Sequence, residues 1–207
     1  MRQLLLPALL ALAAAGSAHA ATQAYQIDPV HSSVVFNVDH NGFSRAFGRL
    51  RISDGTVRFD PDNWAASSVN ATIDLASVDM GDAEWDKAVR GSSLLDADRS
   101  RTARFTSDSV EKRSDDEGTL HGKLTLRGVT LPLDIPFRVN RVGKTIYGLH
   151  TIAGFSANLV LDRTRFGMTE NTGSIGTQVS VWLEIEAIRG GEGPASHDKE
   201  TPDAHAQ

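Results

Sequence analysis

The chain has 207 residues, with 26 acidic and 21 basic side chains that give a formal net charge of −5. It contains no cysteine, which excludes disulfides, zinc–thiolate sites, c-type haem attachment and iron–sulfur clusters. The modest acidic balance argues against a nucleic acid as a partner. The length suits one domain with a sizeable hydrophobic core.

Residues 1–20 have the pattern of a cleaved export signal. Arg2 precedes an apolar run at residues 4–15, and the tripeptide AHA at residues 18–20 is a small-x-small cleavage pattern. As a helix the run would reach roughly 18 Å, short of the about 30 Å hydrocarbon core of a membrane. We therefore expect cleavage rather than a retained anchor, with Ala21 as the mature N-terminus and a periplasmic location.

The rest of the chain divides into one domain and a tail. Residues 21–189 carry the regular apolar pattern and are expected to form a single domain. Residues 190–207 contain no Val, Ile, Leu, Met or aromatic residue. Such a segment cannot bury enough apolar surface to become ordered, so we expect a disordered C-terminal tail.

From residue 33 to residue 187 apolar and polar residues alternate, which is the period of half-buried β-strands. The second alternating run contains Leu50 and is followed by Asp54-Gly55. Because both of these residues tolerate positive φ, the dipeptide predicts a hairpin turn into a further strand through Phe59.

Six later segments show the same alternation, at residues 68–75, 103–110, 120–126, 131–139, 155–161 and 179–185. Pro132 and Pro136 share one parity of their segment, which favours an edge strand or a bulge there. At least eight strands, each with a dry and a wet face, predict an antiparallel sheet that closes on itself or stacks. The fold class is therefore all-β.

The long connection after residue 76 interrupts the strands and predicts one short helix. Asp82 is a suitable N-cap, and Gly91 can end the helix. Trp85, Ala88 and Val89 form a narrow apolar stripe on it. We expect this stripe to lie across one opening or one flank of the sheet.

Two histidines, His31 and His40, flank the first long strand, each near an aspartate. Nine extended residues separate them by roughly 30 Å, so they cannot share a metal ion. His31 falls on the wet parity and is expected to make a hydrogen bond at the start of the strand. His40 falls on the dry parity, where a neutral imidazole could hydrogen-bond the polar head of a ligand.

Motifs of other chemistry are missing from the chain. It has no G-x-S-x-G, H-E-x-x-H, G-x-x-x-x-G-K or G-x-G-x-x-G pattern, so no catalytic or metal-binding residue is predicted. Arg163 and Arg165 lie beside a strand end, where a solvated or paired rim is a better interpretation than an anion site.

Three motifs in order resemble the YceI family of exported lipid-binding proteins. The first reads D-x-x-H-S-x-V-x-F-x-V-x-H-x-G-x-S and is met by Asp28, His31, Ser32, Val34, Phe36, Val38, His40, Gly42 and Ser44. The second, G-x-L-T-x-x-G-V-T, begins at Gly122, and the third, R-F-G-M, begins at Arg165. The resemblance implies a lipocalin-like antiparallel β-barrel of about eight strands whose lumen holds a polyisoprenoid or an isoprenoid quinone, with no catalytic cofactor.

A barrel of eight strands is at the size where the lumen is either filled by side chains or holds one small ligand. The dry faces supply the candidate ligand contacts. They are Val34, Phe36, Val38, His40, Leu50, Phe59, Ile73, Phe105, Leu124, Leu133, Phe137, Phe155, Ala157, Leu159, Val181 and Leu183.

The leading hypothesis is non-catalytic binding, storage or transport of an isoprenoid lipid, with transient contact with a membrane or an envelope partner. One alternative is an exported hydrolase in which Ser32 or Ser44 is the nucleophile and a histidine the base. Another is a protein-interaction module or homodimer that uses Trp182, which lies on the wet parity. Trp182 could instead pack beneath the segment that contains Trp85.

Overall fold

The computed structural model describes residues 22–146 and 149–190. The expected export signal at residues 1–20, its cleavage point before Ala21 and all but the first residue of the expected C-terminal tail lie outside the described residues. Everything below concerns the described part of the chain.

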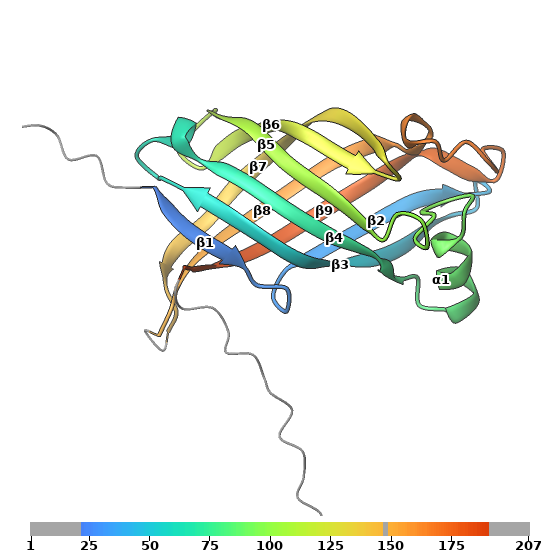
Figure 1. Cartoon of the computed structure of the whole chain (residues 1–207), viewed down its shortest axis with the longest axis horizontal. Helices are drawn as coiled ribbons and strands as arrows, with labels where there is room; N and C mark the ends of the chain where they lie inside the picture. Colours follow the sequence, from blue (N-terminus) through green and yellow to red (C-terminus); the bar gives the residue numbers. More distant parts are fainter. Residues whose placement is uncertain (1–21, 147–148, 191–207) are drawn as a thin grey trace, which may run out of the picture.

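Nine strands make a single antiparallel sheet that closes on itself (Figure 1). The strands are β1 (Gln23–Ile27), β2 (Ser33–His40), β3 (Ser44–Phe59), β4 (Ser68–Asp79), β5 (Thr102–Lys112), β6 (Glu117–Leu126), β7 (Val129–Lys144), β8 (Thr151–Asp162) and β9 (Ile175–Arg189). The helical elements are α1 (Ala83–Arg90) and the 3-10 turns η1 (Trp64–Ala66) and η2 (Arg163–Phe166). The predicted all-β barrel is confirmed.

One position in the barrel is shared by two strands. Both β1 and β2 pair antiparallel with β3 and with β9. β2 pairs with the first part of β3, where Val34 lies opposite Leu50. β1 pairs with the last part of β3, where Tyr25 lies opposite Val57. The barrel therefore closes with eight strand positions, one of them split between β1 and β2.

The two ends of the barrel differ. The turn between β2 and β3, the connection that carries α1 and the connection between β8 and β9 gather at one end, which we call the α1 end (Figure 1). The β3–β4 and β5–β6 connections lie at the other end, which we call the aromatic end for reasons given below. This separation follows from the antiparallel order, because successive turns alternate between the two ends.

The predicted hairpin turn at Asp54-Gly55 is wrong. β3 runs unbroken through this dipeptide, with only a shift of register between Ile52 and Asp54. A Cβ at Gly55 would lie 2.5 Å from Cδ1 of Ile27, so the glycine allows a close approach of β1 instead of a turn. The actual hairpin turn is at Asn41-Gly42, where φ is 54° and 68°.

The two prolines of β7 lie where this strand pairs with β6 alone, as expected of an edge or an irregularity. Its register with β6 is continuous and places Pro132 opposite Lys123. Its register with β8 begins only at Phe137, beyond Pro136, and shifts again further along the strand. Since proline has no amide hydrogen, it cannot donate to a neighbouring strand at these positions.

The short helix is where the sequence predicts it. The Asp82 carboxylate accepts the amide hydrogens of Glu84 and Trp85, which caps the first turn of α1. The amide of Gly91 donates back to the carbonyls of Lys87 and Ala88 and ends the helix. Because no residue of α1 is fully buried, tertiary contacts hold it only along one side.

Candidate ligand cavity in the barrel lumen

The barrel encloses a cavity of about 470 Å³. Inward side chains of all eight strand positions line it, and most of them are aliphatic. All of the candidate ligand contacts predicted from the alternation, from Val34 to Leu183, lie on its wall. Their contact with a bound molecule stays a prediction.

The alternation did not reveal part of the cavity wall. Met80, Trp85, Ala88, Val89, Leu94 and Leu95 reach the cavity from α1 and the connections on its two sides, and Phe166 and Met168 reach it from η2 and the residues after it. None of these segments is a strand, so a period of two could not have found them. The apolar stripe of the helix and the R-F-G-M motif were the available signals.

At the α1 end the cavity reaches the surface. The Trp85 side chain lines the cavity and is also 43% exposed. Its ring lies 5.3 Å from that of His40, between ring centroids, at a tilt of 56°. Asp39 and His40 are the polar side chains that β2 contributes to this opening. The imidazole therefore lies where a polar head attached to a buried chain would emerge.

At the aromatic end the lumen is closed by rings. Phe59, Trp64, Phe137 and Phe155 are all buried, and neighbouring rings have their centroids 5.5–6.3 Å apart. Most of these pairs meet edge to face, the geometry that aromatic quadrupoles favour. The ammonium of Lys112 lies 5.3 Å from the centroid of the Trp64 ring, on the outside of the cluster.

Arg163 departs from the predicted solvated or paired rim, whereas Arg165 fits it. Arg165 is exposed, but Arg163 is buried and lines the cavity. Its guanidinium donates to the backbone carbonyls of Met168, Glu170, Ile175 and Gly176. Burial lowers the pKa of this side chain, although Asp162 beside it opposes the shift. The arginine therefore organises the β8–β9 connection and has its donors engaged there.

His31 makes the hydrogen bond expected of a residue at the start of a strand. Its Nδ1 lies 2.7 Å from a carboxylate oxygen of Asp28. This hydrogen bond raises the pKa of His31. Burial raises the pKa of Asp28, but hydrogen bonds from His31 and from the amide of Val30 outweigh it, so the net pKa is lowered.

The two serines of the hydrolase alternative have different surroundings. The Ser32 hydroxyl is buried, donates to the carbonyl of Glu186 and accepts the amide hydrogen of the same residue. Ser44 is exposed and lies opposite His40 in the β2–β3 register. Within residues 22–146 and 149–190, neither hydroxyl is hydrogen-bonded to a histidine.

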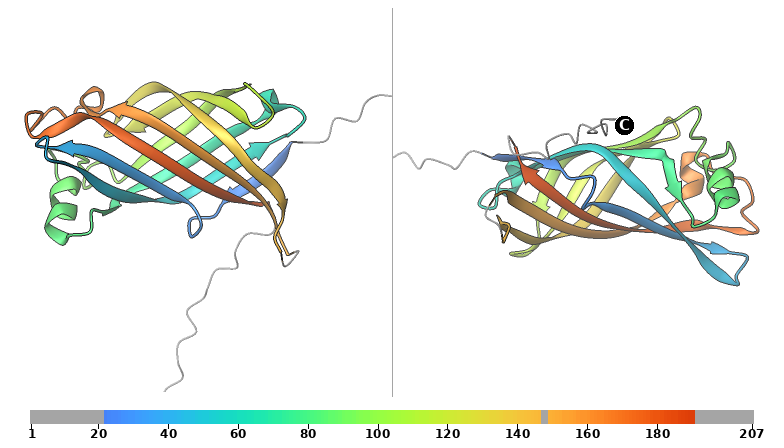
Figure 2. Two further views of the ribbon diagram at one scale, coloured as in Figure 1. Left: turned by 180° about the vertical axis from the view of Figure 1, so that it is seen from behind. Right: turned by 90° about the horizontal axis from the view of Figure 1, so that it is seen from below.

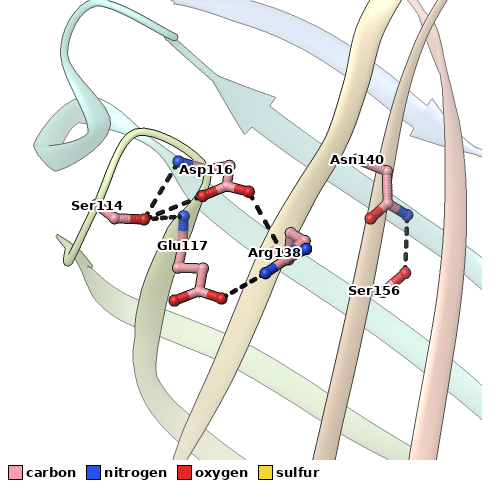
Figure 3. A network of polar contacts seen from close by, with 6 residues as sticks. All are labelled: Ser114, Asp116, Glu117, Arg138, Asn140 and Ser156. Atoms are coloured by element: carbon pink, nitrogen blue, oxygen red, sulfur yellow. Dashed lines mark hydrogen bonds and ion pairs between the residues drawn. The ribbon is translucent and has the colours of Figure 1, made fainter.

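A polar network on the outer surface of the barrel lies away from the cavity opening. The Nη2 of Arg138 donates to a carboxylate oxygen of Glu117 at 2.8 Å (Figure 3). The Nε of Arg138 lies 3.6 Å from a carboxylate oxygen of Asp116. Asn140 donates to Ser156, which donates in turn to Glu184. These bonds join neighbouring strands of the barrel.

Among the described residues, no group of three or more histidine, aspartate or glutamate side chains is placed to hold a metal ion. No helix in the described ranges is long and apolar enough to cross a membrane.

Trp182 does not pack beneath the Trp85 segment. It stacks instead on Phe47 on the outer face of the barrel, with ring centroids 6.3 Å apart.

Comparisons with known proteins agree with this architecture. The model of the YceI-like domain matches residues 25–187. A UPF0312 protein of Pectobacterium atrosepticum is 35% identical over 184 residues, which cover 89% of this chain and 95% of that protein. Another, from Ectopseudomonas mendocina, is 36% identical over 174 residues, which cover 84% and 91% of the two chains.

Solved structures show the same fold. BcnA of Burkholderia cenocepacia has 26% sequence identity and a TM-score of 0.69, and the match covers 78% of this chain and 99% of that one. A polyisoprenoid binding domain of Saccharophagus degradans, implicated in plant cell wall breakdown, has 16% identity and a TM-score of 0.61, with 81% and 99% covered. The family model over residues 25–187 and the relative that is 35% identical show that the chain belongs to the YceI family.

Proposed function

We propose that this protein binds one long isoprenoid lipid, a polyisoprenoid or an isoprenoid quinone, in the barrel lumen, and that it stores or carries this lipid outside the cytoplasm. The observation that carries the proposal is the apolar cavity of about 470 Å³, open beside Trp85 and closed by the aromatic cluster. The Saccharophagus degradans neighbour, described as a polyisoprenoid binding domain, supports this ligand class.

The physical chemistry of the cavity favours a carrier. Each buried CH₂ group is worth about 0.8 kcal/mol against water, so a chain of many carbons would hardly escape into solution. A bilayer interior is as apolar as the lumen, so transfer between the two is close to neutral. The protein should therefore keep its lipid through purification in buffer and exchange it on contact with vesicles.

The test is solvent extraction and mass spectrometry of the protein purified from its natural host. We expect a roughly stoichiometric isoprenoid. Ala157→Trp or Val181→Trp places an indole in the lumen and should lower this occupancy while the far-UV spectrum stays β-rich. Asn158→Trp is the matched control, because Asn158 is the exposed neighbour of Ala157 on β8 and is not part of the cavity wall.

Two results would contradict the proposal. One is a clean extract from wild-type protein made in its natural host. The other is equal occupancy in Ala157→Trp and Asn158→Trp, because a ligand in the lumen must compete with the added indole.

We also propose export and a non-catalytic role. Export rests on the sequence pattern of residues 1–20, and the intact mass of the exported protein should begin at Ala21. A retained signal in the mature form would contradict the periplasmic location. A reproducible esterase activity that is lost in Ser32→Ala with Ser44→Ala would contradict the non-catalytic role.

A further inference from the structure

At the α1 end the β2–β3 hairpin diverges to one side of the barrel (Figure 2, right). Phe43 lies in its turn, and its side chain is 93% exposed. The strands on both sides of the turn contribute His40 and Ala46 to the cavity wall. The most exposed aromatic side chain of the described chain therefore lies beside the opening of the cavity.

The turn that presents Phe43 is held by hydrogen bonds. The amide of Asn41 donates to the carbonyl of Ser174 at 2.7 Å, which ties the hairpin to the β8–β9 connection. The amide of Gly42 donates to the Asp39 carboxylate at 2.9 Å. The amide of Phe43 itself donates to the carbonyl of His40. The phenyl ring is thus directed into solvent by an ordered backbone.

An aromatic pair, Phe47 of β3 and Trp182 of β9, continues the exposed surface along the outer face of the barrel beside the hairpin. Phe47 is 58% exposed and Trp182 39%, and their rings are stacked at an interplanar angle of 18°. Phe47 has the outward parity of β3, and Trp182 has the outward parity of β9. Exposed aromatic residues beside one another are uncommon on a surface that meets only water.

Cationic side chains lie on the two sides of Phe47 along the same face. Arg45 donates from Nε to the Asn37 side chain at 2.7 Å, and Arg49 donates to the Ser33 hydroxyl at 3.3 Å. Both partners are neutral, and in the described ranges neither arginine belongs to an ion pair. These guanidinium groups keep their charge available for an anionic surface.

Aspartates lie opposite both arginines in the sheet register. Asp39 is opposite Arg45, and Asp79 is opposite Arg49. Each of these carboxylates accepts an amide hydrogen of a turn, from Gly42 and from Gly81. The aspartates reduce the local positive potential, so the aromatic side chains should contribute more to binding than the arginines do.

We propose that the β2–β3 hairpin, with Phe43 at its tip and Phe47, Arg45 and Arg49 on its outer face, docks the protein on an anionic bilayer together with the neighbouring Trp182 of β9 and directs the cavity opening toward the lipid. Aromatic rings and arginines are the side chains that favour the interface between water and hydrocarbon. This inference rests on the proposed function, since it gives the bound lipid a path that avoids water.

The experiment uses vesicles of phosphatidylglycerol and phosphatidylcholine that contain solanesol, a neutral polyprenol. Flotation measures binding to the vesicles, and mass spectrometry of the recovered protein follows the rate of solanesol uptake. Phe43→Ser with Phe47→Ser should lower both the bound fraction and the uptake rate by about tenfold, because two exposed rings are lost from the contact. Raising the salt concentration should weaken binding of the wild type by a smaller factor.

Val30→Ser with Ile146→Ser is the matched control. These two side chains are 81% and 90% exposed, and both lie away from the α1 end. The control should float and take up solanesol as the wild type does. Phe43→Ser alone changes only a side chain in solvent, and it keeps the test valid if Phe47→Ser disturbs the fold.

The outcomes separate this inference from the proposed function. If the wild type never retains solanesol after prolonged incubation, the proposed function fails. The hairpin variant is Phe43→Ser with Phe47→Ser. If the wild type retains solanesol and the hairpin variant has the same vesicle-bound fraction and the same rate of solanesol uptake, the docking inference fails. Wild-type dimers in light scattering that are lost in the hairpin variant, without vesicle binding by either protein, would identify the face as a self-association surface and overturn the inference.

Discussion

The two ends of the lumen are built from different kinds of contact. At the aromatic end Phe59, Trp64, Phe137 and Phe155 are buried against one another. At the α1 end a helix without a fully buried residue lies beside the opening, and its Trp85 is 43% exposed. Local opening is easiest where few apolar contacts must be broken. If the lumen holds a lipid, as we propose, the aromatic end would stop its chain and the α1 end would admit it.

The largest effect should come from the aromatic end. Phe137→Ala removes a ring that packs on Trp64 and Phe155 and should cost about 3 to 5 kcal/mol of unfolding free energy. The same change lengthens the lumen, so the bound isoprenoids should shift toward longer chains. Chemical denaturation measures the first effect and mass spectrometry of extracts the second. Unchanged chain lengths in a folded variant would show that the cluster does not limit the ligand.

At the α1 end we expect a smaller loss of stability and a faster exchange of lipid. Trp85→Ala removes a partly exposed ring that contacts His40, so it should cost only about 1 to 2 kcal/mol of unfolding free energy. Uptake and loss of a lipid on vesicles should become faster, because the opening is wider. If Trp85→Ala slows exchange, the ring guides the chain instead of limiting its passage.

The sequence predicted the strands and the cavity wall well, for a physical reason. In a strand the period of two fixes the side to which each residue points, so the alternation placed Phe36, Ala157 and Val181 on the inner face before the barrel was known. It could not place Met80 or Phe166, because their segments are not strands and reach the cavity only through the closure of the barrel.

The errors came from residues whose role depends on distant neighbours. Asp54-Gly55 is compatible with a turn but does not require one, and the close approach of β1 decides its conformation. Arg163 is buried because four backbone carbonyls, from the rest of the β8–β9 connection and from the start of β9, surround its guanidinium. Trp182 finds its partner, Phe47, more than a hundred residues earlier in the chain. Local sequence contains none of this information.

A smaller effect should follow from loosening α1 itself. Asp82→Ala removes the carboxylate that accepts the amides of Glu84 and Trp85, which should cost about 1 kcal/mol locally. Hydrogen exchange should become faster in α1, while β6 and β7 remain protected. Asp62→Ala is the control at the other end of the barrel, because Asp62 is exposed and its side chain caps no helix. Equal loss of protection throughout the barrel would mean that α1 is not an independent unit.

The smallest effect should be a pH dependence of stability. It should involve neither end of the lumen, because the Asp28–His31 pair lies in the connection between β1 and β2. The pKa of His31 is raised above 6.5 by its bond to Asp28, so its contribution to stability is complete below that pH and is lost as the pH rises through the raised pKa. The pKa of Asp28 is lowered below 3.8, so its contribution is present above that pH and is lost as the pH falls through the lowered pKa. The melting temperature of the wild type should therefore exceed that of His31→Gln most between about pH 4 and 6.5 and approach it in alkaline buffer. The difference should be small, because the His31 side chain is 63% exposed. A difference that grows with pH would contradict the assignment, and lipid exchange should not change across the same range.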